Sequence, residues 1–291
     1  MKNILVTGGH GFIASHTIEE LKKRGYKVVT NVRSIKAVED DYLKDVDRYL
    51  IDNRDSVGMR SIIEKIDGVI NLAGILGTKS VDNSQTFYEN NVKAAVGIFG
   101  ACVEYNVPIV QITVGNYFEF NDYSNSKVLA ERELIKFARF KGLRGNCVRG
   151  LNAFGERQKI RNTGKIIPTF IYNALNSLPI KVYGGKDNCG VMDMIYVKDL
   201  AKILVDVLEQ TEAVNNYGNV YEAGSGVGMP VFQIAELVKS FTKSVSVIVE
   251  VPMRSGESKS SVVVAQNPYT NELTDFKTAL KRTIKYYEGL N

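Results

Sequence analysis

The sequence predicts an α/β protein built on a doubly wound parallel sheet, with a smaller α/β lobe toward the C-terminus. Short apolar stretches alternate with amphipathic stretches through the first half of the 291 residues. Strand–helix alternation of this kind produces a parallel sheet with helices on both faces. After Arg149 the alternation loosens, which indicates a second lobe whose elements partly return to the first.

Each expected strand is a short apolar stretch, and each expected helix is longer and amphipathic. The expected strands are 2–7, 27–32, 47–51, 68–73, 108–113 and 143–149, with a strand end and turn at 182–185. The expected helices are 11–24, 81–105, 123–141, 164–178 and one around 274–288. The first domain is expected over 1–163, with 190–225 partly returning to it, and the second lobe over 164–291.

The composition argues against several kinds of site and partner. Two histidines, His10 and His16, are too few to favour a His-based metal site or a Ser-His-Asp triad, so no metal is expected. Three widely spaced cysteines favour a reducing compartment over a disulfide framework. The net charge of +5 is scattered, without the basic and aromatic pattern of a nucleic-acid surface. With no apolar run of membrane-spanning length and no signal-peptide pattern, we expect a cytoplasmic protein that binds neither nucleic acid nor membrane.

The stretch ILVTGGHGFIASH, residues 4–16, has the pattern of a phosphate-binding loop. A strand is followed by Gly8, Gly9 and Gly11 and then by a helix. Glycine lets the backbone approach a pyrophosphate closely, and the helix N-terminus offers unpaired N–H groups. Ala14 stands at the last loop position, where alanine is an accepted variant. The stretch therefore predicts a dinucleotide site in a Rossmann-type sheet rather than a glycine turn without a ligand.

The end of the second expected strand bears on the choice between NAD and NADP. An acidic residue about 20 residues past the loop favours NAD, whereas an arginine favours NADP. The segment VVTNVRS contains no acid, and Arg33 directly follows the strand. We expect NAD or NADP, with Arg33 slightly favouring NADP through a 2′-phosphate contact; the alternative is a solvated cation. Asp52 is expected either to hold the adenine amine or to cap a helix over 54–65.

The stretch NDYSNSKVLAERE carries a tyrosine and a lysine four residues apart. Tyr123 and Lys127 then share one face of a helix. A nearby ammonium and a positive nicotinamide ring lower the pKa of a phenol from about 10, so Tyr123 can take a proton while hydride leaves to the cofactor. Thr113 ends the fifth expected strand and is expected to place a hydroxyl beside the tyrosine; the alternative is an ordinary strand-end threonine.

With these motifs the chain resembles the extended short-chain dehydrogenase/reductases, in their nucleotide-sugar epimerase/dehydratase branch (UDP-glucose 4-epimerase-like). TGGHGFIASH is similar to that family's cofactor loop, NLAG to its fourth-strand motif, NNVKAA to its Asn-Val segment and YSNSK to its Tyr-x-x-x-Lys. The resemblance covers nearly the whole chain and implies Thr113, Tyr123 and Lys127 as catalytic residues. The cofactor-binding residues expected from motifs and resemblance together are Gly8, Gly11, Phe12, Ile13, Arg33, Asp52, Asn53, Leu72, Ala73, Gly74, Asn91, Tyr123 and Lys127.

For the second lobe the resemblance implies a nucleotide diphosphate sugar as substrate. RGLNAFG looks like the segment that brings an asparagine, here Asn152, to the diphosphate, and RSGE, which begins with Arg254, looks like the segment that clamps it. MDMIYVKDLA resembles a block in which many members begin with a phosphate-binding arginine, but here Met192 takes that place. The clamp is therefore expected to depend on Arg254.

The resemblance also implies a homodimer. The helices expected over 81–105 and 123–141 correspond to those that form a four-helix contact between subunits in the family. The second helix offers Leu129, Leu134, Ile135 and Phe137 beyond what one core face needs, unless these residues pack inside the monomer.

Departures from the family pattern reduce the number of reactions that the chain is expected to catalyse. Dehydratases that act across C4–C6 carry an Asp-Glu pair where this chain has Val114 and Gly115, and the Cys and His of fucose-forming epimerases are absent. The link between Thr113 and Tyr123 is much shorter than usual, which predicts a more open wall over the sugar. Glu119 within this link is either a substitute acid or, as we favour, an exposed loop carboxylate.

Thr113, Tyr123 and Lys127 remain as catalytic candidates, and with a dinucleotide they suffice for reversible oxidation at one carbinol of the sugar. The first expectation is an NAD(P)-dependent nucleotide-sugar epimerase, acting most simply at C4. The alternatives are an NADPH-dependent reductase of a nucleotide-linked keto sugar, which Arg33 suits, and an unusual dehydratase. A dinucleotide sensor without catalysis is a further alternative, but it would not need Tyr123 and Lys127 together.

Overall fold

The computed structural model describes residues 2–33, 41–76, 84–119, 121–160, 164–253, 260–261, 269 and 272–290. The chain divides into two compact units, Met1–Gly150 with Leu200–Tyr221, and Leu151–Asp199 with Glu222–Asn291. Helix α8 (Val197–Ala213) and strand β10 (Val220–Ala223) each have residues in both units.

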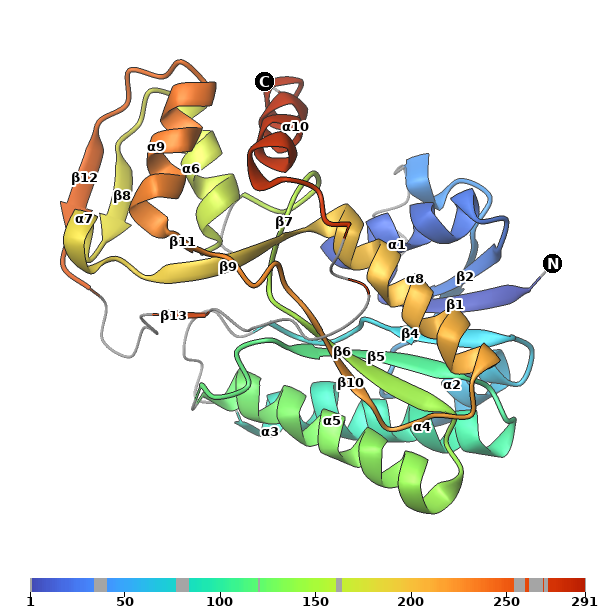
Figure 1. Cartoon of the computed structure of the whole chain (residues 1–291). Helices are drawn as coiled ribbons and strands as arrows, with labels where there is room; N and C mark the ends of the chain where they lie inside the picture. The colour runs from blue at the N-terminus through green and yellow to red at the C-terminus, as the bar shows by residue number, and fades with distance from the viewer. Residues whose placement is uncertain are drawn as a thin grey trace. The chain divides into compact units, whose positions relative to one another are not determined.

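The first unit is built on a seven-stranded sheet of order β10-β6-β5-β4-β1-β2-β3 (Figure 1). Neighbouring strands from β3 through β6 pair in parallel. Their bounds are β1 (Asn3–Thr7), β2 (Lys27–Val32), β3 (Asp47–Leu50), β4 (Gly68–Asn71), β5 (Ile109–Val114) and β6 (Gly145–Gly150). Each lies within two residues of the strand expected from the apolar pattern.

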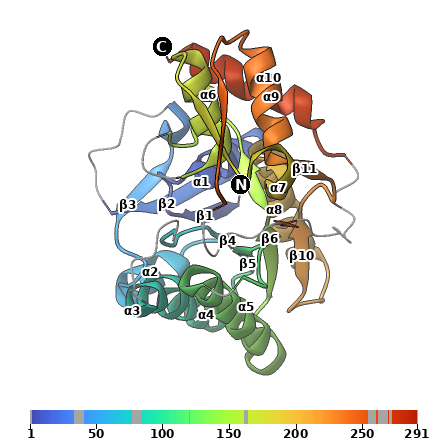
Figure 2. The same cartoon turned by 90° about the vertical axis from the view of Figure 1, so that its left-hand side faces the viewer.

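Helices cover both faces of this sheet (Figure 2). One face carries α2 (Ser56–Ile63), α4 (Ala94–Glu104) and α5 (Asp122–Lys141), whose apolar side chains form a core with those of the strands. The other face carries α1 (Phe12–Lys23) and α8, which are joined where Arg24 pairs with Asp206 and Glu209. The doubly wound, Rossmann-type sheet expected from the sequence is thus confirmed.

The long helix expected over 81–105 contains a π-helical segment. It runs as α3 (Ser84–Phe87), the π segment η3 (Tyr88–Lys93) and α4, while 81–83 lie outside the described residues. A short 3₁₀ turn, η2 (Asp41–Leu43), precedes β3. Asn91 lies within η3, and π segments of this kind are frequent at functional sites.

Helix α5 buries more of its apolar residues than the sequence suggested. Leu134 and Phe137 are 0% and 6% exposed, and the Phe137 ring packs against Phe99. The expectation that these two side chains are available beyond one core face is therefore wrong, because α5 packs against both the sheet and its neighbour α4. Leu129 is 44% exposed and Ile135 is half-buried.

The second unit contains two small sheets and a group of helices. Strands β7 (Asn152–Phe154), β9 (Val191–Tyr196), β11 (Gly228–Pro230) and β13 (Ser260–Ser261) form one sheet, and β8 (Ile180–Tyr183) pairs in parallel with β12 (Ile248–Val251). The helices are α6 (Ile166–Leu175), α7 (Gly185–Asn188), α9 (Val231–Phe241) and α10 (Phe276–Glu288). The buried Ile171, Ile180, Ile234 and Leu280 form part of its core.

Candidate active site

The glycine loop between β1 and α1 is a tight turn that leads into an uncapped helix start. Gly8 has a φ of 71°, and a Cβ on Gly9 would lie 2.3 Å from the hydroxyl oxygen of Thr30. The first two glycines are therefore required by conformation and by close approach to β2. Gly11 is the N-cap of α1, and no side chain caps this helix end, where Phe12 and Ile13 begin the first turn. An uncapped helix start behind a tight glycine turn fits a phosphate group.

A buried threonine joins the carboxyl ends of β1 and β4. The Thr7 hydroxyl donates to Oδ1 of Asn71 at 2.6 Å and accepts from the backbone N–H groups of Leu72 and Ala73 at 3.0 Å each. A Cβ on Gly8 would lie 3.2 Å from Cα of Ala73. The glycine loop and the NLAG segment therefore meet at one edge of the sheet, as a shared cofactor site requires.

The end of β2 carries a buried asparagine followed by an exposed arginine. Asn31 is 2% exposed; its Oδ1 accepts from Gly8 N at 3.2 Å, and its Nδ2 donates to Ile51 O at 2.9 Å and to Oδ1 of Asn53. Asn31 thus ties the glycine loop to the segment after β3 without adding charge. In the part of the chain that the structure describes, no hydrogen bond or ion pair holds the side chain of Arg33.

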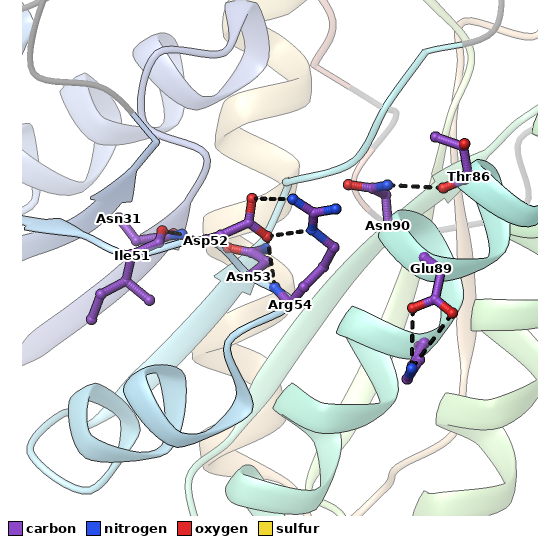
Figure 3. Close-up of polar contacts among 9 residues, drawn as sticks. Asn31, Ile51, Asp52, Asn53, Arg54, Thr86, Glu89 and Asn90 are labelled. Atoms are coloured by element: carbon purple, nitrogen blue, oxygen red, sulfur yellow. Dashed lines mark hydrogen bonds and ion pairs between the residues drawn. The ribbon is translucent and has the colours of Figure 1, made fainter.

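Asp52, expected to hold an adenine amine, is bound by a neighbouring arginine (Figure 3). Its Oδ1 accepts from Arg54 N at 2.9 Å and Nε at 2.8 Å, and its Oδ2 accepts from an Arg54 terminal nitrogen at 3.1 Å. The hydrogen bond from Arg54 is the main cause that lowers the pKa of Asp52. The alternative role as a helix cap is wrong, because α2 begins at Ser56 and Asp55 caps it by accepting from Gly58 N.

Asn91, on the π segment, joins the chain after β4 to helix α5. Its side chain is 2% exposed; Oδ1 accepts from Ile75 N at 2.8 Å, and Nδ2 donates to Ile75 O at 3.2 Å and to Ser126 Oγ at 3.0 Å. The Ser126 hydroxyl in turn donates to Tyr123 O at 2.7 Å. Asn91 thus fixes the first turn of α5 relative to the segment that follows β4.

Lys127 is a buried cation beside the cofactor segment. It is 5% exposed, and a Cβ placed on Gly74 would lie 3.8 Å from its Nζ and 2.8 Å from Asn91 Oδ1. No hydrogen bond or ion pair with any of the described residues holds its ammonium group. Burial lowers the pKa of Lys127 to about 8. An unpaired buried ammonium is characteristic of a site that binds a polar ligand.

Tyr123 lies one helical turn before Lys127, at the start of α5. Its ring contacts Phe87 edge-on, with the ring centroids 6.3 Å apart. Burial raises the pKa of Tyr123 to about 12. The phenol is therefore held protonated, and positive charge close to its oxygen is needed before it can act as a base.

Thr113 forms no hydrogen bond with Tyr123. Its hydroxyl is bound instead to a buried ion pair, Glu131 with Arg149, that the sequence did not indicate. The Thr113 hydroxyl, on a side chain 4% exposed, donates to Glu131 Oε2 at 2.8 Å. Arg149 donates to the same carboxylate from Nε at 2.9 Å and from a terminal nitrogen at 2.5 Å. Glu131 follows Lys127 by one turn on the same helix face, which is the sequence signal that could have indicated it.

In the second unit, Asn152 contacts the backbone of β9. Its Nδ2 donates to Asp193 O at 3.0 Å, and the buried Asp193 carboxylate accepts from Ser225 N and Gly226 N at 2.7 Å each. Met192 lies on β9 and is paired in register with Met229 of β11. Arg254 lies outside the described residues.

A cavity of about 390 Å³ also lies within the second unit. It is lined by Gly184, Gly185, Asn188, Glu250, Val251, Pro252 and Met253. Its last lining residue directly precedes Arg254 in the sequence.

The residues that the structure describes contain neither a metal-ligand cluster nor a membrane-spanning helix. No three His, Cys, Asp or Glu side chains among them come together as metal ligands could. Within the same limits, none of the helices combines the length and the apolar character needed to cross a membrane.

Proteins of known activity are similar to the chain over most of its length. A UDP-glucose 4-epimerase of Caenorhabditis elegans is 29% identical over 89% of this chain and 88% of its own. A UDP-N-acetyl-alpha-D-glucosaminuronate decarboxylase of Bacillus cytotoxicus is 28% identical over 86% of this chain and 84% of its own.

Solved structures share the fold. The crystal structure of UDP-glucose 4-epimerase from Thermotoga maritima with UDP-glucose has a TM-score of 0.88 at 22% identity, over 99% of both chains. That of the Thermus thermophilus UDP-glucose 4-epimerase complex with NAD has a TM-score of 0.85 at 24% identity, over 99% of this chain and 100% of the other. At these identities the likeness establishes the fold.

The family model described as "NAD dependent epimerase/dehydratase family" matches residues 4–224. That range includes the glycine loop, the segment after β4 and the Tyr123–Lys127 pair. The chain therefore belongs to the NAD-dependent epimerase/dehydratase family, as the motifs and the site geometry together indicate.

Proposed function

We propose that this protein is a nucleotide-sugar epimerase that oxidises and re-reduces one sugar carbinol, most simply at C4, with Tyr123 as the base. The observation that carries the proposal is the position of Lys127, a buried ammonium that none of the described residues pairs, one helical turn from Tyr123 and next to Gly74. The relatives named as UDP-glucose 4-epimerases support the same reaction class.

The residues of the first unit fit a nicotinamide dinucleotide. Gly8 and Gly11, with Phe12 and Ile13 at the uncapped start of α1, would hold the pyrophosphate. Asp52 and Asn53 would border the adenine end, and Leu72, Ala73, Gly74 and Asn91 the nicotinamide end. When bound, such a dinucleotide supplies a reversible hydride acceptor.

Tyr123 would carry the proton, and Lys127 would supply the positive charge that favours its phenolate. Tyr123 takes the proton of the sugar hydroxyl and later returns it to the carbonyl oxygen. Its pKa of about 12 suits the return step, while the charge on Lys127, whose pKa is about 8, favours the phenolate that the first step needs. Because the Thr113 hydroxyl donates to Glu131, the proton transfer is assigned to Tyr123 alone, with the charge of Lys127 favouring the phenolate.

The proposed substrate is a nucleotide diphosphate sugar, and the proposed assembly is a homodimer. Asn152 and Arg254 are its proposed diphosphate ligands, and the cavity that ends at Met253 is a candidate for part of the nucleotide. For the dimer, the exposed Leu129 of α5 offers the contact that Leu134 and Phe137 do not.

Interconversion of UDP-glucose and UDP-galactose by the purified protein tests the reaction class. Tyr123→Phe is expected to lower kcat by about a thousandfold, because the proton acceptor is lost. Tyr49→Phe, at a tyrosine that is 40% exposed on the edge strand β3, is the matched control and should leave kcat unchanged. Full activity in Tyr123→Phe would contradict the proposed base.

A second candidate is an NADPH-dependent reductase of a nucleotide-linked keto sugar. It is favoured by the neutral Asn31 and the exposed Arg33 at the end of β2, where an acid would favour NAD. Denaturing the purified protein and identifying any released nucleotide separates the two. A stoichiometric dinucleotide supports the epimerase, which regenerates its cofactor, and an empty site with a preference for NADPH supports the reductase.

A further inference from the structure

In the short link between β5 and α5, one carboxylate joins two asparagines. Oε1 of Glu119 accepts from Nδ2 of Asn116 at 3.1 Å, and Oε2 accepts from Nδ2 of Asn121 at 3.3 Å. The backbone makes two further bonds, from Glu119 N to Asn116 O and from Asn121 N to Glu119 O. The Glu119 carboxylate therefore bridges Asn116 and Asn121 instead of lying free on the surface.

The same carboxylate sets the orientation of a helix cap. Asn121 is the N-cap of α5, and its Oδ1 accepts from Ser124 N at 2.8 Å. An asparagine amide can turn either its oxygen or its nitrogen toward the helix. A carboxylate only accepts hydrogen bonds, so Glu119 selects the nitrogen of Asn121 and leaves the oxygen to cap the helix.

Tyr123 lies between the cap and the capped residue, so its place depends on this first turn. A second contact holds the link from another side, where the Arg149 guanidinium lies 3.9 Å from the centroid of the Tyr117 ring. Further along α5 the pair of Arg149 and Glu131 fixes the helix to β6. The helix start, which carries Tyr123, is held by Asn91 through Ser126 and by the Asn121 cap.

We propose that Glu119 is a positioning residue for Tyr123, acting through the amide of Asn121. This inference rests on the proposed function, in which Tyr123 moves the proton. It gives the sequence's one acid in the link a role that is neither proton transfer nor simple solvation. A misplacement of the phenol by about 1 Å is enough to slow proton transfer severely, so the effect should appear in kcat.

The test is a mutant cycle at Glu119 and Asn121 in the full chain, assayed with UDP-galactose. Glu119→Ala is expected to lower kcat about tenfold, with KM and the cofactor dissociation constant within about twofold of the unchanged protein. Asn121→Asp alone should also lower kcat, because two carboxylates then face each other. In Glu119→Gln/Asn121→Asp the glutamine nitrogen donates to the new carboxylate, so kcat should return to within about twofold.

A second readout does not depend on the substrate. Hydrogen exchange at the Ser124 amide should become about fivefold faster in Glu119→Ala and recover in the double variant, since the cap is lost and then restored. Asp55→Ala, which removes the cap of α2, is the control: it should speed exchange at Gly58 and leave kcat unchanged.

The outcomes separate the two proposals. The unmodified protein could be inactive as an epimerase while hydrogen exchange at Ser124 still responds to Glu119→Ala. That result would overturn the proposed function and keep the role of Glu119 in holding the start of α5. Unchanged exchange and kcat in Glu119→Ala overturn the positioning role. The positioning role is also overturned if kcat of the double variant is no higher than that of the single variants. The same holds if Glu119→Ala impairs KM and cofactor binding as much as kcat, because Glu119 would then be a structural residue only.

Discussion

The Thr113 hydroxyl donates its hydrogen bond to the buried carboxylate of Glu131, at 2.8 Å. Glu131 lies eight residues after Tyr123 in α5, which is about 12 Å along the axis of an α-helix. A hydroxyl has a single proton, and here that proton is committed to Glu131. The hydroxyl proton is thus bound two helical turns along α5 from Tyr123, whereas the sequence predicted that the hydroxyl lies beside the phenol.

Thr113→Val tests the role of this hydroxyl. The substitution keeps the shape of the side chain and removes one hydrogen bond to a charged, buried partner, so the free energy of unfolding should fall by about 2 kcal/mol. The kcat for UDP-galactose should change by less than about threefold. Urea unfolding and steady-state kinetics measure the two quantities, and a loss of kcat beyond about a hundredfold would restore Thr113 as a catalytic residue.

Much of the first unit could be predicted because its signals are local. Apart from the exposed β3, strands β1 to β6 are largely apolar runs that end in or precede glycine or polar residues, and the turn at Gly8 requires a residue without a side chain. The spacing of Tyr123 and Lys127 indicated their shared helix face in the same local way. The π segment Tyr88–Lys93 could not be predicted, since nothing in YENNVK distinguishes it from α-helix.

The contacts that the sequence did not indicate depend on how elements pack. The cluster of Thr113, Glu131 and Arg149 exists because β5 and β6 pair Thr113 with Arg149 in register, while α5 lays Glu131 against both. Asn31 was noted only as the absence of an acid, yet it joins three segments. Such roles follow from tertiary placement, which a periodic pattern does not encode.

Gly74→Ala should weaken cofactor binding. The added Cβ would lie 2.8 Å from Asn91 Oδ1 and 3.8 Å from Lys127 Nζ, so Asn91 must move and release Ile75 N. We expect about a tenfold higher dissociation constant for the dinucleotide and a loss of about 1–3 kcal/mol in the free energy of unfolding.

The control for this substitution is Gly100→Ala in α4. A Cβ there meets nothing within 4 Å, so the change should leave cofactor binding unchanged and stabilise the helix by about 0.5–1 kcal/mol. Dinucleotide titration followed by fluorescence compares the two variants. Equal affinities in both would contradict a cofactor segment that runs through Gly74.

Arg33→Ala should change the choice of dinucleotide. If Arg33 contacts a 2′-phosphate, the dissociation constant of NADP should rise about tenfold to a hundredfold, while that of NAD stays the same. Arg48→Ala removes an equal charge from the neighbouring strand β3 and should affect neither cofactor. Titrations with both dinucleotides decide the question, and a parallel loss for NAD and NADP would assign Arg33 to general attraction.

Lys127→Met should make the protein more stable and less active. Burial depresses the pKa of Lys127 from 10.5 to about 8, so at pH 7 the folded state holds a charge that the unfolded state accommodates better. The shift corresponds to about 3 kcal/mol against folding below pH 8. Between pH 8 and 10.5 the folded state has lost this proton and the unfolded state still binds it, so the stability of the unchanged protein rises with pH.

The free energy of unfolding of Lys127→Met should therefore exceed that of the unchanged protein most at pH 7, and the difference should shrink toward pH 10. Urea unfolding at several pH values measures this difference. Lys93→Met, at a lysine 66% exposed on the π segment, should change the free energy of unfolding by less than about 0.5 kcal/mol at every pH. An equal or lower stability of Lys127→Met at pH 7 would mean that the ammonium is solvated or paired in the folded protein. An unchanged kcat in Lys127→Met would separately contradict the role of this charge in favouring the Tyr123 phenolate.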